Sequence, residues 1–185
     1  MVSLLVCATV AKSSRSNPNI VDTREKPLII SVIGGGNPSA RALQLASSVG
    51  QELAKAGVMV VCGGLSGVME AVCKGAKSAG GTTIGILPGN SPQEGNKYID
   101  IPICTGMGYA RNVIVVKTGR AVIAIDGSFG TLSEIGHALG DNIPVIGLET
   151  WDLGIGGIIE TSIIRANTPI EAVRLAVDAA YKRDD

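Results

Sequence analysis

The sequence predicts a single α/β domain in which helices cover both faces of a parallel β-sheet. Short aliphatic runs alternate with segments whose apolar residues recur at helical spacing, and glycine-rich turns separate the two. Hydrophobic residues make up 45% of the 185 residues but aromatic residues only 3%, so aliphatic side chains must fill the core, as in covered parallel sheets. A chain of this length can bury one core but is too short for two ordinary domains.

Strands and helices alternate from the start of this predicted domain. An aliphatic run at residues 28–33 predicts the first strand, and residues 40–56 predict a helix that ends at Gly57. The second strand is expected over residues 58–62 and the second helix over residues 66–79. Strands and helices joined by such short turns form parallel, right-handed units.

The second half of the chain repeats this pattern less regularly. Residues 82–87 predict a third strand, residues 90–97 a polar loop over the site, and residues 101–104 a short strand or edge piece. Residues 108–117 are expected to be helical despite their β-branched side chains. The remaining predicted elements are strands over residues 121–125 and 144–147 and helices over residues 131–139 and 168–182.

Residues 1–27 differ from the rest of the chain. A short apolar stretch over residues 1–10 precedes a segment, residues 11–19, that is rich in Ser, Lys, Arg and Asn. A signal peptide places its positive charges before the apolar stretch, which is the reverse of this order. We interpret residues 1–27 as a flexible N-terminal extension, with a transit-like segment or an extra edge strand as alternatives, and assign the folded domain to residues 28–185.

The composition argues against nucleic acids and membranes as partners. Lys plus Arg and Asp plus Glu are equal at 16, so the chain has no broad basic field. One Phe, one Trp and three Tyr are too few for a base-stacking platform. No apolar run approaches the roughly 20 residues that cross a bilayer. We therefore expect a small-molecule partner.

The cysteines and the one histidine also argue against a metal site. Cys7, Cys62, Cys73 and Cys104 contain no C-x-x-C pair, and His137 is the only histidine. We expect reduced thiols, some of them in the core, in a reducing compartment such as the cytoplasm. We expect His137 to be a buried, satisfied residue rather than a ligand, and no metal bound by protein side chains.

The first glycine-rich turn does not specify a common nucleotide-binding class. Gly34, Gly36 and Ser39 approximate the dinucleotide fingerprint, but the third glycine is missing. The fingerprint also expects a carboxylate at the end of the second strand, where residues 60–64 offer none. The sequence also lacks a G-x-x-x-x-G-K-[ST] motif, which argues against a P-loop NTPase.

The strongest motif is the turn over residues 126–131, between the strand at 121–125 and the following helix. Small residues there bring main-chain N–H groups together at a helix N-terminus, where unpaired donors and the helix dipole favour a phosphate. Glu134 lies one turn into the helix and would face whatever the phosphate carries. The predicted phosphate-binding residues are Gly127, Ser128, Phe129, Gly130 and Thr131.

Two further glycine turns meet at the same sheet edge. Parallel sheets bind ligands beyond the carboxyl ends of their strands, so loops 34–39, 63–67, 88–97 and 126–131 should converge there. Gly63, Gly64 and Gly67 could instead allow close packing of helices on strands, and Asn37 and Ser39 could only cap the first helix. The additional candidate binding residues are Gly34, Gly35, Gly36, Asn37, Gly63 and Gly64.

Arg111 and Glu134 are the candidates for chemistry, and each has a structural alternative. Arg111 lies in an apolar segment, so it must form a salt bridge or bind a ligand phosphate or hydroxyl. Glu134 completes a T-x-x-E pattern over residues 131–134 that also forms capping boxes. The same pattern at residues 168–171 begins a helix without any glycine turn, so only the turn before Glu134 raises it to a site residue.

Three motifs in this order carry a resemblance to a known family: residues 63–69, 107–112 and 127–134. The chain resembles the LOG-like, or lysine decarboxylase-like, Rossmann superfamily over about residues 28–151. Its short length, its Arg111-Asn112 pair and the helix start at residues 133–135 make it most similar to the branch of the molybdenum cofactor carrier proteins. The resemblance implies a Rossmann-like fold and a homodimer or homotetramer.

The resemblance also implies two competing functions. In both, the turn at residues 127–131 holds a phosphate, and Met107 and Arg111 join the ligand-binding residues. In the hydrolase branch, Arg111 and Glu134 would be catalytic on the N-glycosidic bond of a nucleoside monophosphate. In the carrier branch, the pocket holds the phosphate of the molybdenum cofactor without turnover.

Two departures from the hydrolase pattern favour the carrier. Residues 126–128 read Asp-Gly-Ser where the hydrolases have Pro-Gly-Gly, and Asn112 stands where they usually have Lys. The sequence therefore favours a carrier of a phosphorylated, nucleotide-like ligand over a phosphoribohydrolase. A nucleotide-sensing module that works through oligomerisation is a third interpretation.

Overall fold

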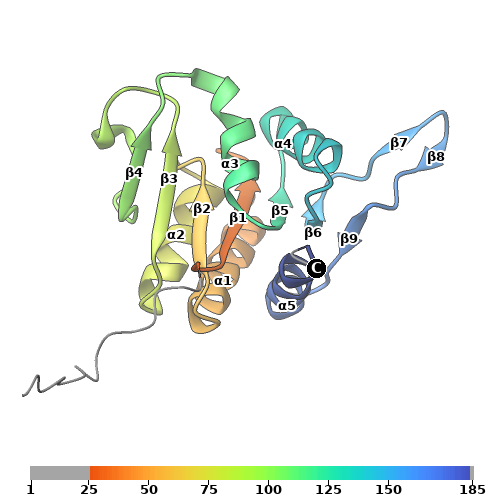
Figure 1. Cartoon of the computed structure of the whole chain (residues 1–185), viewed down its shortest axis with the longest axis horizontal. Helices are drawn as coiled ribbons and strands as arrows, with labels where there is room; N and C mark the ends of the chain where they lie inside the picture. The colour runs from red at the N-terminus through yellow and green to blue at the C-terminus, as the bar shows by residue number, and fades with distance from the viewer. Residues whose placement is uncertain (1–25, 184–185) are drawn as a thin grey trace, which may run out of the picture.

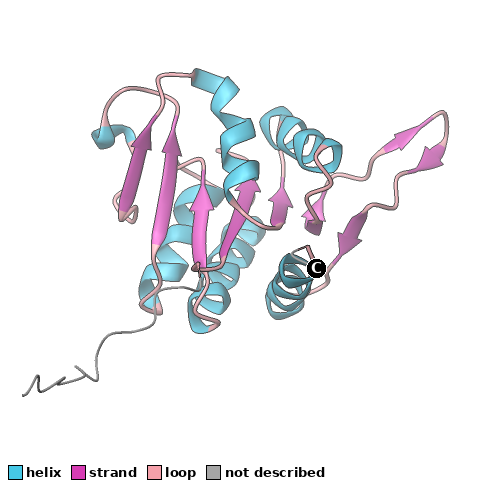
Figure 2. Ribbon diagram, viewed as in Figure 1, coloured by secondary structure: helices cyan, strands magenta, loops and turns pink. Residues whose placement is uncertain are grey.

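A computed structural model of the chain describes residues 26–183 and confirms the predicted α/β fold (Figure 1, Figure 2). Seven parallel strands form one sheet in the order β4-β3-β2-β1-β5-β6-β9. The strands are β1 (Ile29–Gly34), β2 (Met59–Cys62), β3 (Thr83–Leu87), β4 (Ile101–Cys104), β5 (Val122–Asp126), β6 (Val145–Thr150) and β9 (Ile163–Arg165). The predicted extension, residues 1–27, lies almost wholly outside the described residues.

Residues 26–183 also form five α-helices and two short 3-10 helices. A separate antiparallel hairpin follows β6 and consists of β7 (Gly154–Ile155) and β8 (Ile158–Ile159). Among residues 26–183, no helix is long and apolar enough to cross a membrane. The α-helices are α1 (Ala40–Lys55), α2 (Val68–Ser78), α3 (Asn112–Thr118), α4 (Phe129–Gly140) and α5 (Pro169–Lys182), and the 3-10 helices are η1 (Pro92–Glu94) and η2 (Gly108–Arg111).

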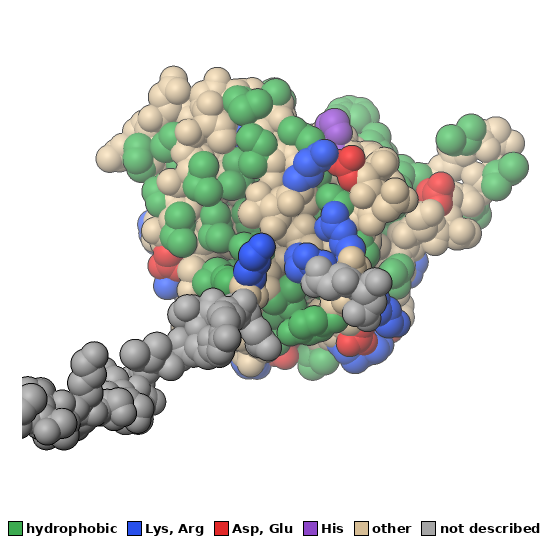
Figure 3. All heavy atoms as spheres, in the orientation of Figure 1, with side chains coloured by type: hydrophobic (Ala, Val, Ile, Leu, Met, Phe, Trp, Pro, Cys, Tyr) green, Lys and Arg blue, Asp and Glu red, His purple; other side chains and the backbone are tan. Residues whose placement is uncertain are grey.

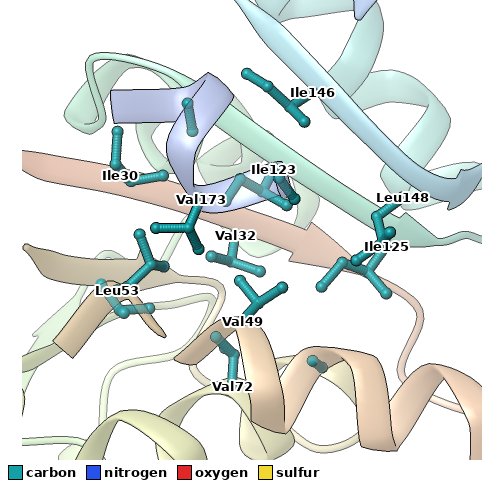
Figure 4. Packing of buried hydrophobic residues seen from close by; sticks show 14 of the residues in the cluster. Ile30, Val32, Val49, Leu53, Val72, Ile123, Ile125, Ile146, Leu148 and Val173 are labelled. Carbon is teal, nitrogen blue, oxygen red and sulfur yellow. The ribbon is translucent and has the colours of Figure 1, made fainter. Parts of the chain in front are cut away.

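The sheet separates two apolar layers, because successive strand residues point to opposite faces. Ile30 and Val32 of β1 pack against α1, α2 and α5, in the layer that Figure 4 shows. Ile33 of the same strand packs on the opposite face with Val115 of α3 and Ile135 of α4. Aliphatic residues fill both layers, as the composition predicts.

Helices α1 and α2 cross at two glycines. A Cβ atom on Gly50 would lie 2.0 Å from the carbonyl oxygen of Val72, and one on Gly75 would lie 1.9 Å from that of Ser47. Both distances are too short for any side chain, and the contacted atoms belong to the main chain. The two glycines therefore set how closely the helices approach.

Replacing Gly75 with alanine is expected to lower the free energy of unfolding by about 2 kcal/mol, because the helices must separate to admit the methyl group. Gly136 of α4 is a matched control, since nothing lies within 4 Å of the position of its Cβ atom. Gly136→Ala should stabilise by up to about 1 kcal/mol through helix propensity. Urea unfolding of both variants measures the difference, and equal effects would contradict the close-approach argument.

Helix α4 begins two residues earlier than the sequence predicts. Ser128 is its N-cap, and the Ser128 N–H donates a hydrogen bond to Thr131 Oγ1 at 3.3 Å. The cap is thus formed by Ser128 and Thr131, and the interpretation of residues 131–134 as the capping box is wrong. Glu134 is left without a capping role.

The region after β6 contains elements that the sequence did not predict. The β7–β8 hairpin turns at Gly156 and Gly157, both with positive φ, and projects from the body of the molecule (Figure 1). Its exposed isoleucines are visible as the hydrophobic tip in Figure 3. Strands of two or three residues are too short to show a periodic apolar pattern.

The expected buried, free thiols are found at Cys62 and Cys73, but the expectation for His137 is wrong. Cys62 and Cys73 are free and buried with their Sγ atoms 3.5 Å apart, Cys104 is free and half-buried, and Cys7 lies outside the described residues. His137 is exposed, so the expectation of a buried histidine is wrong (Figure 3). It lies on α4 next to Gly136 and away from the face that packs on the sheet.

Candidate functional site

The candidate site lies where β1 and β5 pair at the centre of the sheet. Gly34 at the end of β1 lies opposite Ile125 at the end of β5. The chain continues from β1 into α1 on one face and from β5 into α4 on the other face. The loops therefore diverge here and form the topological switch point where parallel sheets bind ligands.

The turn after β5 has an unusual backbone at its first two residues. Asp126 has φ 55° and Gly127 has φ 156°. The Asp126 carboxylate accepts a hydrogen bond from the Ser39 N–H at 3.4 Å, at the N-terminus of α1. The negative charge is thus directed toward the first helix, and Asp126 does not line the pocket at α4.

A pocket of about 490 Å³ opens at the N-terminus of α4. The first N–H groups of a helix have no partner within it, so those of Phe129 and Gly130 are available to a ligand. The volume falls within the range of about 300–1,000 Å³ that is usual for small-molecule sites. The pocket is lined by Tyr109, Asn112, Ser128, Phe129, Gly130 and Ser133.

Arg111 lies behind this pocket, with only 6% of its surface exposed. Its Nε donates to the carbonyl oxygen of Ile86 at 2.8 Å and its Nη2 to that of Gly63 at 3.2 Å, so the guanidinium joins the ends of β2 and β3. Its Nη1 donates to Asn112 Oδ1. The hydrogen-bond partners of Arg111 are therefore two main-chain carbonyl groups and the Asn112 amide. The predicted alternative, a salt bridge to a carboxylate, is not formed by these contacts.

Glu134 is also buried, with 7% of its surface exposed. Burial raises the pKa of its carboxyl to about 7, while the positive charge of Arg111 opposes this rise. Burial conversely lowers the pKa of Arg111 from its usual value, and the charge of Glu134 works against that change. The two groups are therefore electrostatic neighbours beneath the ends of the strands.

Asn112 connects this buried pair to the pocket. Its amide oxygen accepts from Arg111, and its Nδ2 donates to Ser133 Oγ at 3.2 Å. Ser133 Oγ in turn donates to the carbonyl oxygen of Gly130 at 2.7 Å, in the first turn of α4. The sequence motifs included Asn112 and Ser133 but gave no sign that they would face the pocket, because their contact depends on how α3 packs against α4.

The structure brings together only some of the candidate residues. Ser128, Phe129 and Gly130 line the pocket. Thr131, the next residue, is buried, and Met107 is exposed and does not belong to the lining. Arg111 and Glu134 lie behind the pocket wall rather than in it. Gly127 packs against Trp151, since a Cβ atom there would lie 2.6 Å from the indole Nε1.

The glycines of the first two turns have close-packing roles. A Cβ atom on Gly34 would lie 2.5 Å from the carbonyl oxygen of Ile125, and one on Gly63 would lie 2.6 Å from Arg111 Nη2. Gly64 has φ 75° and packs against Leu87. Gly35 approaches the turn after β5, because its Cβ atom would lie 4.0 Å from the Ser128 nitrogen.

Gly36 and Asn37 face a different cavity. This space of about 660 Å³ lies between α1 and α2 and is also lined by Glu70, Lys74 and Lys97. A third cavity of about 920 Å³ lies at the amino ends of the strands, beside Arg120 and Tyr181. Parallel sheets bind ligands at the opposite edge, which excludes the cavity at the amino ends. Of the other two cavities, we assign the functional site to the pocket at α4, because it contains the predicted phosphate-binding residues Ser128, Phe129 and Gly130. Within residues 26–183, no group of three His, Cys, Asp or Glu side chains is placed to hold a metal ion.

A parallel sheet with α-helices on both faces and a pocket at its switch point defines a Rossmann-like domain. The chain belongs to the SLOG cluster4 family (LDcluster4), whose model matches residues 27–179. The resemblance to the LOG-like superfamily is thereby confirmed.

The chain is similar to solved structures and to a curated relative whose names describe two different functions. It is similar to the molybdenum cofactor binding protein of Rippkaea orientalis, at 36% identity and TM-score 0.75, with 83% of this chain and 97% of that chain covered. The molybdenum cofactor carrier protein of Chlamydomonas reinhardtii is 32% identical, with TM-score 0.73 and coverage of 84% and 99%. A cytokinin riboside 5'-monophosphate phosphoribohydrolase of Mycobacterium tuberculosis is 28% identical over 153 residues, which cover 75% of this chain and 80% of the relative.

Proposed function

We propose that this protein binds and carries a phosphorylated, nucleotide-like small molecule, with the molybdenum cofactor as the leading candidate. One observation carries the proposal: none of the residues that line the pocket at α4 has a charged side chain, and Arg111 and Glu134 lie outside its lining. Such a pocket can hold an anion without placing an ionised acid or base on the bound molecule. The structural similarity to proteins named for molybdenum cofactor binding supports the same conclusion.

In this proposal the phosphate lies on the first turn of α4. The N–H groups of Phe129 and Gly130 donate to its oxygens, and the helix dipole adds a favourable field. The Ser128 hydroxyl and the Asn112 amide are further donors at the pocket wall. We further propose a homodimer or homotetramer in the cytoplasm, where buried thiols such as Cys62 and Cys73 stay reduced.

A phosphoribohydrolase is the second candidate, and one observation favours it. A carboxyl whose pKa is raised to about 7 is matched to general acid–base catalysis near neutral pH, and Glu134 has this property beside the positive charge of Arg111. The similarity to the Mycobacterium tuberculosis hydrolase agrees with this alternative. It requires the pocket wall to rearrange so that Glu134 reaches the glycosidic bond.

Mass spectrometry of the small molecule retained through gentle purification separates the two functions. A retained pterin supports the carrier, and adenine release from AMP by the purified protein supports the hydrolase. If adenine is released, Glu134→Gln should abolish the release. Unchanged release by that variant would remove Glu134 from the mechanism.

The phosphate position itself is tested at the cap of α4. Ser128→Asp should lower affinity for AMP at least tenfold by placing a carboxylate beside the phosphate, with little loss of stability because Asp is a good N-cap. Thr168→Asp is the matched control, since Thr168 caps α5 and lines none of the three cavities described above. Isothermal titration calorimetry and thermal unfolding measure the two effects, and equal AMP affinities in both variants would contradict the assigned position.

A further inference from the structure

Two exposed aromatic residues line the same small pocket. Tyr109 is 87% exposed and Phe129 is 82% exposed, and both line the pocket at the N-terminus of α4. The sequence contains only five aromatic residues, so this pairing uses two of the few that it has. Because both rings are exposed to solvent beside one pocket, they offer apolar surface that a bound ligand can cover.

The two rings come from different elements. Tyr109 belongs to η2, which precedes α3, and Phe129 is the first residue of α4. Trp151 supports Phe129 from outside the pocket, with ring centroids 6.1 Å apart and planes inclined at 33°. Trp151 also packs against Gly127. The contact between Phe129 and Trp151 is therefore next to the proposed phosphate-binding turn.

Apart from Gly130, the remaining residues that line the pocket are polar and uncharged. They are Asn112, Ser128 and Ser133, which carry both hydrogen-bond donors and acceptors. An aliphatic partner surface would leave these groups unpaired, whereas the edge of a heterocycle has matching donors and acceptors. The lining therefore suits a planar, polar-edged ring better than a protein surface.

We propose that Tyr109 and Phe129 clamp a planar heterocycle of the ligand, while the first turn of α4 holds its phosphate. This inference rests on the proposed function and names its ligand class: phosphorylated molecules that carry an aromatic heterocycle, in preference to plain sugar phosphates. The hydrogen bonds from Asn112 to Ser133 and from Ser133 to Gly130 fix these polar side chains relative to the first turn of α4.

The test compares ligands with and without a ring in the full-length protein. AMP and neopterin monophosphate carry a planar heterocycle, whereas ribose 5-phosphate carries only the phosphate and sugar. Stacking on an aromatic side chain contributes about tenfold in affinity. With two rings in contact, isothermal titration calorimetry should therefore show that at least one ring-bearing probe binds at least tenfold more tightly than ribose 5-phosphate.

Two variants and a control test whether Tyr109 and Phe129 cause the difference in affinity between ring-bearing probes and ribose 5-phosphate. Phe129→Leu and Tyr109→Leu should each weaken binding of the ring-bearing probe about tenfold and leave ribose 5-phosphate within twofold. Tyr181→Leu replaces an exposed tyrosine on α5, outside the pocket, and should change neither. The one tryptophan gives a second signal, because Trp151 contacts Phe129 and its emission should change when a ring-bearing probe binds.

The outcomes distinguish this inference from the proposed function. Equal affinities for ring-bearing probes and ribose 5-phosphate would overturn the clamp while leaving the phosphate site intact. Failure of every phosphorylated probe to bind would overturn both. If Phe129→Leu changes the oligomeric mass but not the preference for ring-bearing probes, the aromatic residues form a subunit contact and the clamp is overturned.

Discussion

At pH 8, Glu134→Gln is expected to raise the free energy of unfolding by about 3 kcal/mol. Burial raises the pKa of the Glu134 carboxyl from 4.5 to about 7, and each pKa unit corresponds to about 1.4 kcal/mol. The wild-type protein must ionise this buried carboxyl at pH 8. Glutamine has nearly the same shape and stays neutral, so it avoids that cost.

The expected effect depends on pH in a defined direction. The folded state binds the Glu134 proton more tightly than the unfolded state, so this proton stabilises the protein at low pH. That contribution is present below pH 4.5 and is lost as the pH rises to about 7. The advantage of Glu134→Gln should therefore shrink to about 1 kcal/mol or less at pH 5.

Urea unfolding at several pH values measures this effect. Glu94→Gln provides the control, because Glu94 is an exposed residue of η1 and its replacement removes the same charge from the surface. If Glu134→Gln changes stability equally at pH 5 and pH 8, the Glu134 carboxyl is solvated and the buried arrangement with Arg111 is contradicted. A stable Glu134→Gln protein would also make the AMP hydrolysis test conclusive, since loss of activity could not come from unfolding.

The sequence predicted the elements whose signals are local. Aliphatic runs such as those of β1 and β5 are visible within six residues, and a glycine turn between a strand and a helix identifies the switch-point loop directly. The hairpin β7–β8 and the edge strand β9 were missed because their two or three residues carry no period. The predicted start of α4 was two residues too late, because Thr131 can form a capping box either with Glu134 or with Ser128. In the structure, Thr131 accepts a hydrogen bond from Ser128.

The candidate site was predicted only in outline, because its decisive contacts are not local. Arg111 bonds carbonyl groups 25 and 48 residues away, at the ends of β3 and β2. The contact of Asn112 with Ser133 joins two helices that pack on the same face of the sheet. Sequence spacing could bring Arg111 and Glu134 to one sheet edge but could not show that both lie behind the pocket wall.

Removal of Arg111 is expected to have the largest effect on stability. Arg111→Met should lower the free energy of unfolding by about 3–5 kcal/mol, the usual cost of removing one member of a buried charged network. The carbonyl groups of Ile86 and Gly63 lose their donor, as does the amide oxygen of Asn112. Methionine fills the apolar part of the space but supplies no hydrogen bond.

Arg41 offers a matched control for this substitution. Its guanidinium lies 3.1 Å from the Glu149 carboxylate, but both side chains are exposed. Exposed ion pairs contribute at most about 1 kcal/mol, so Arg41→Met should have a small effect. Similar losses in the two variants would show that Arg111 is solvated and does not hold the strand ends together.

Arg111 and Glu134 are also expected to be coupled. Without the positive charge of Arg111, the pKa of Glu134 should rise further, because that charge is what opposes the effect of burial. The Arg111→Met protein should therefore lose stability over a wider pH range than the wild type, as the Glu134 proton is held to higher pH. Adding Glu134→Gln should recover more stability at pH 8 in the Arg111→Met background than in the wild type, and a double-mutant cycle measures this difference. Equal recovery in both backgrounds would mean that the two side chains do not interact, and that the pocket wall is not built on this pair.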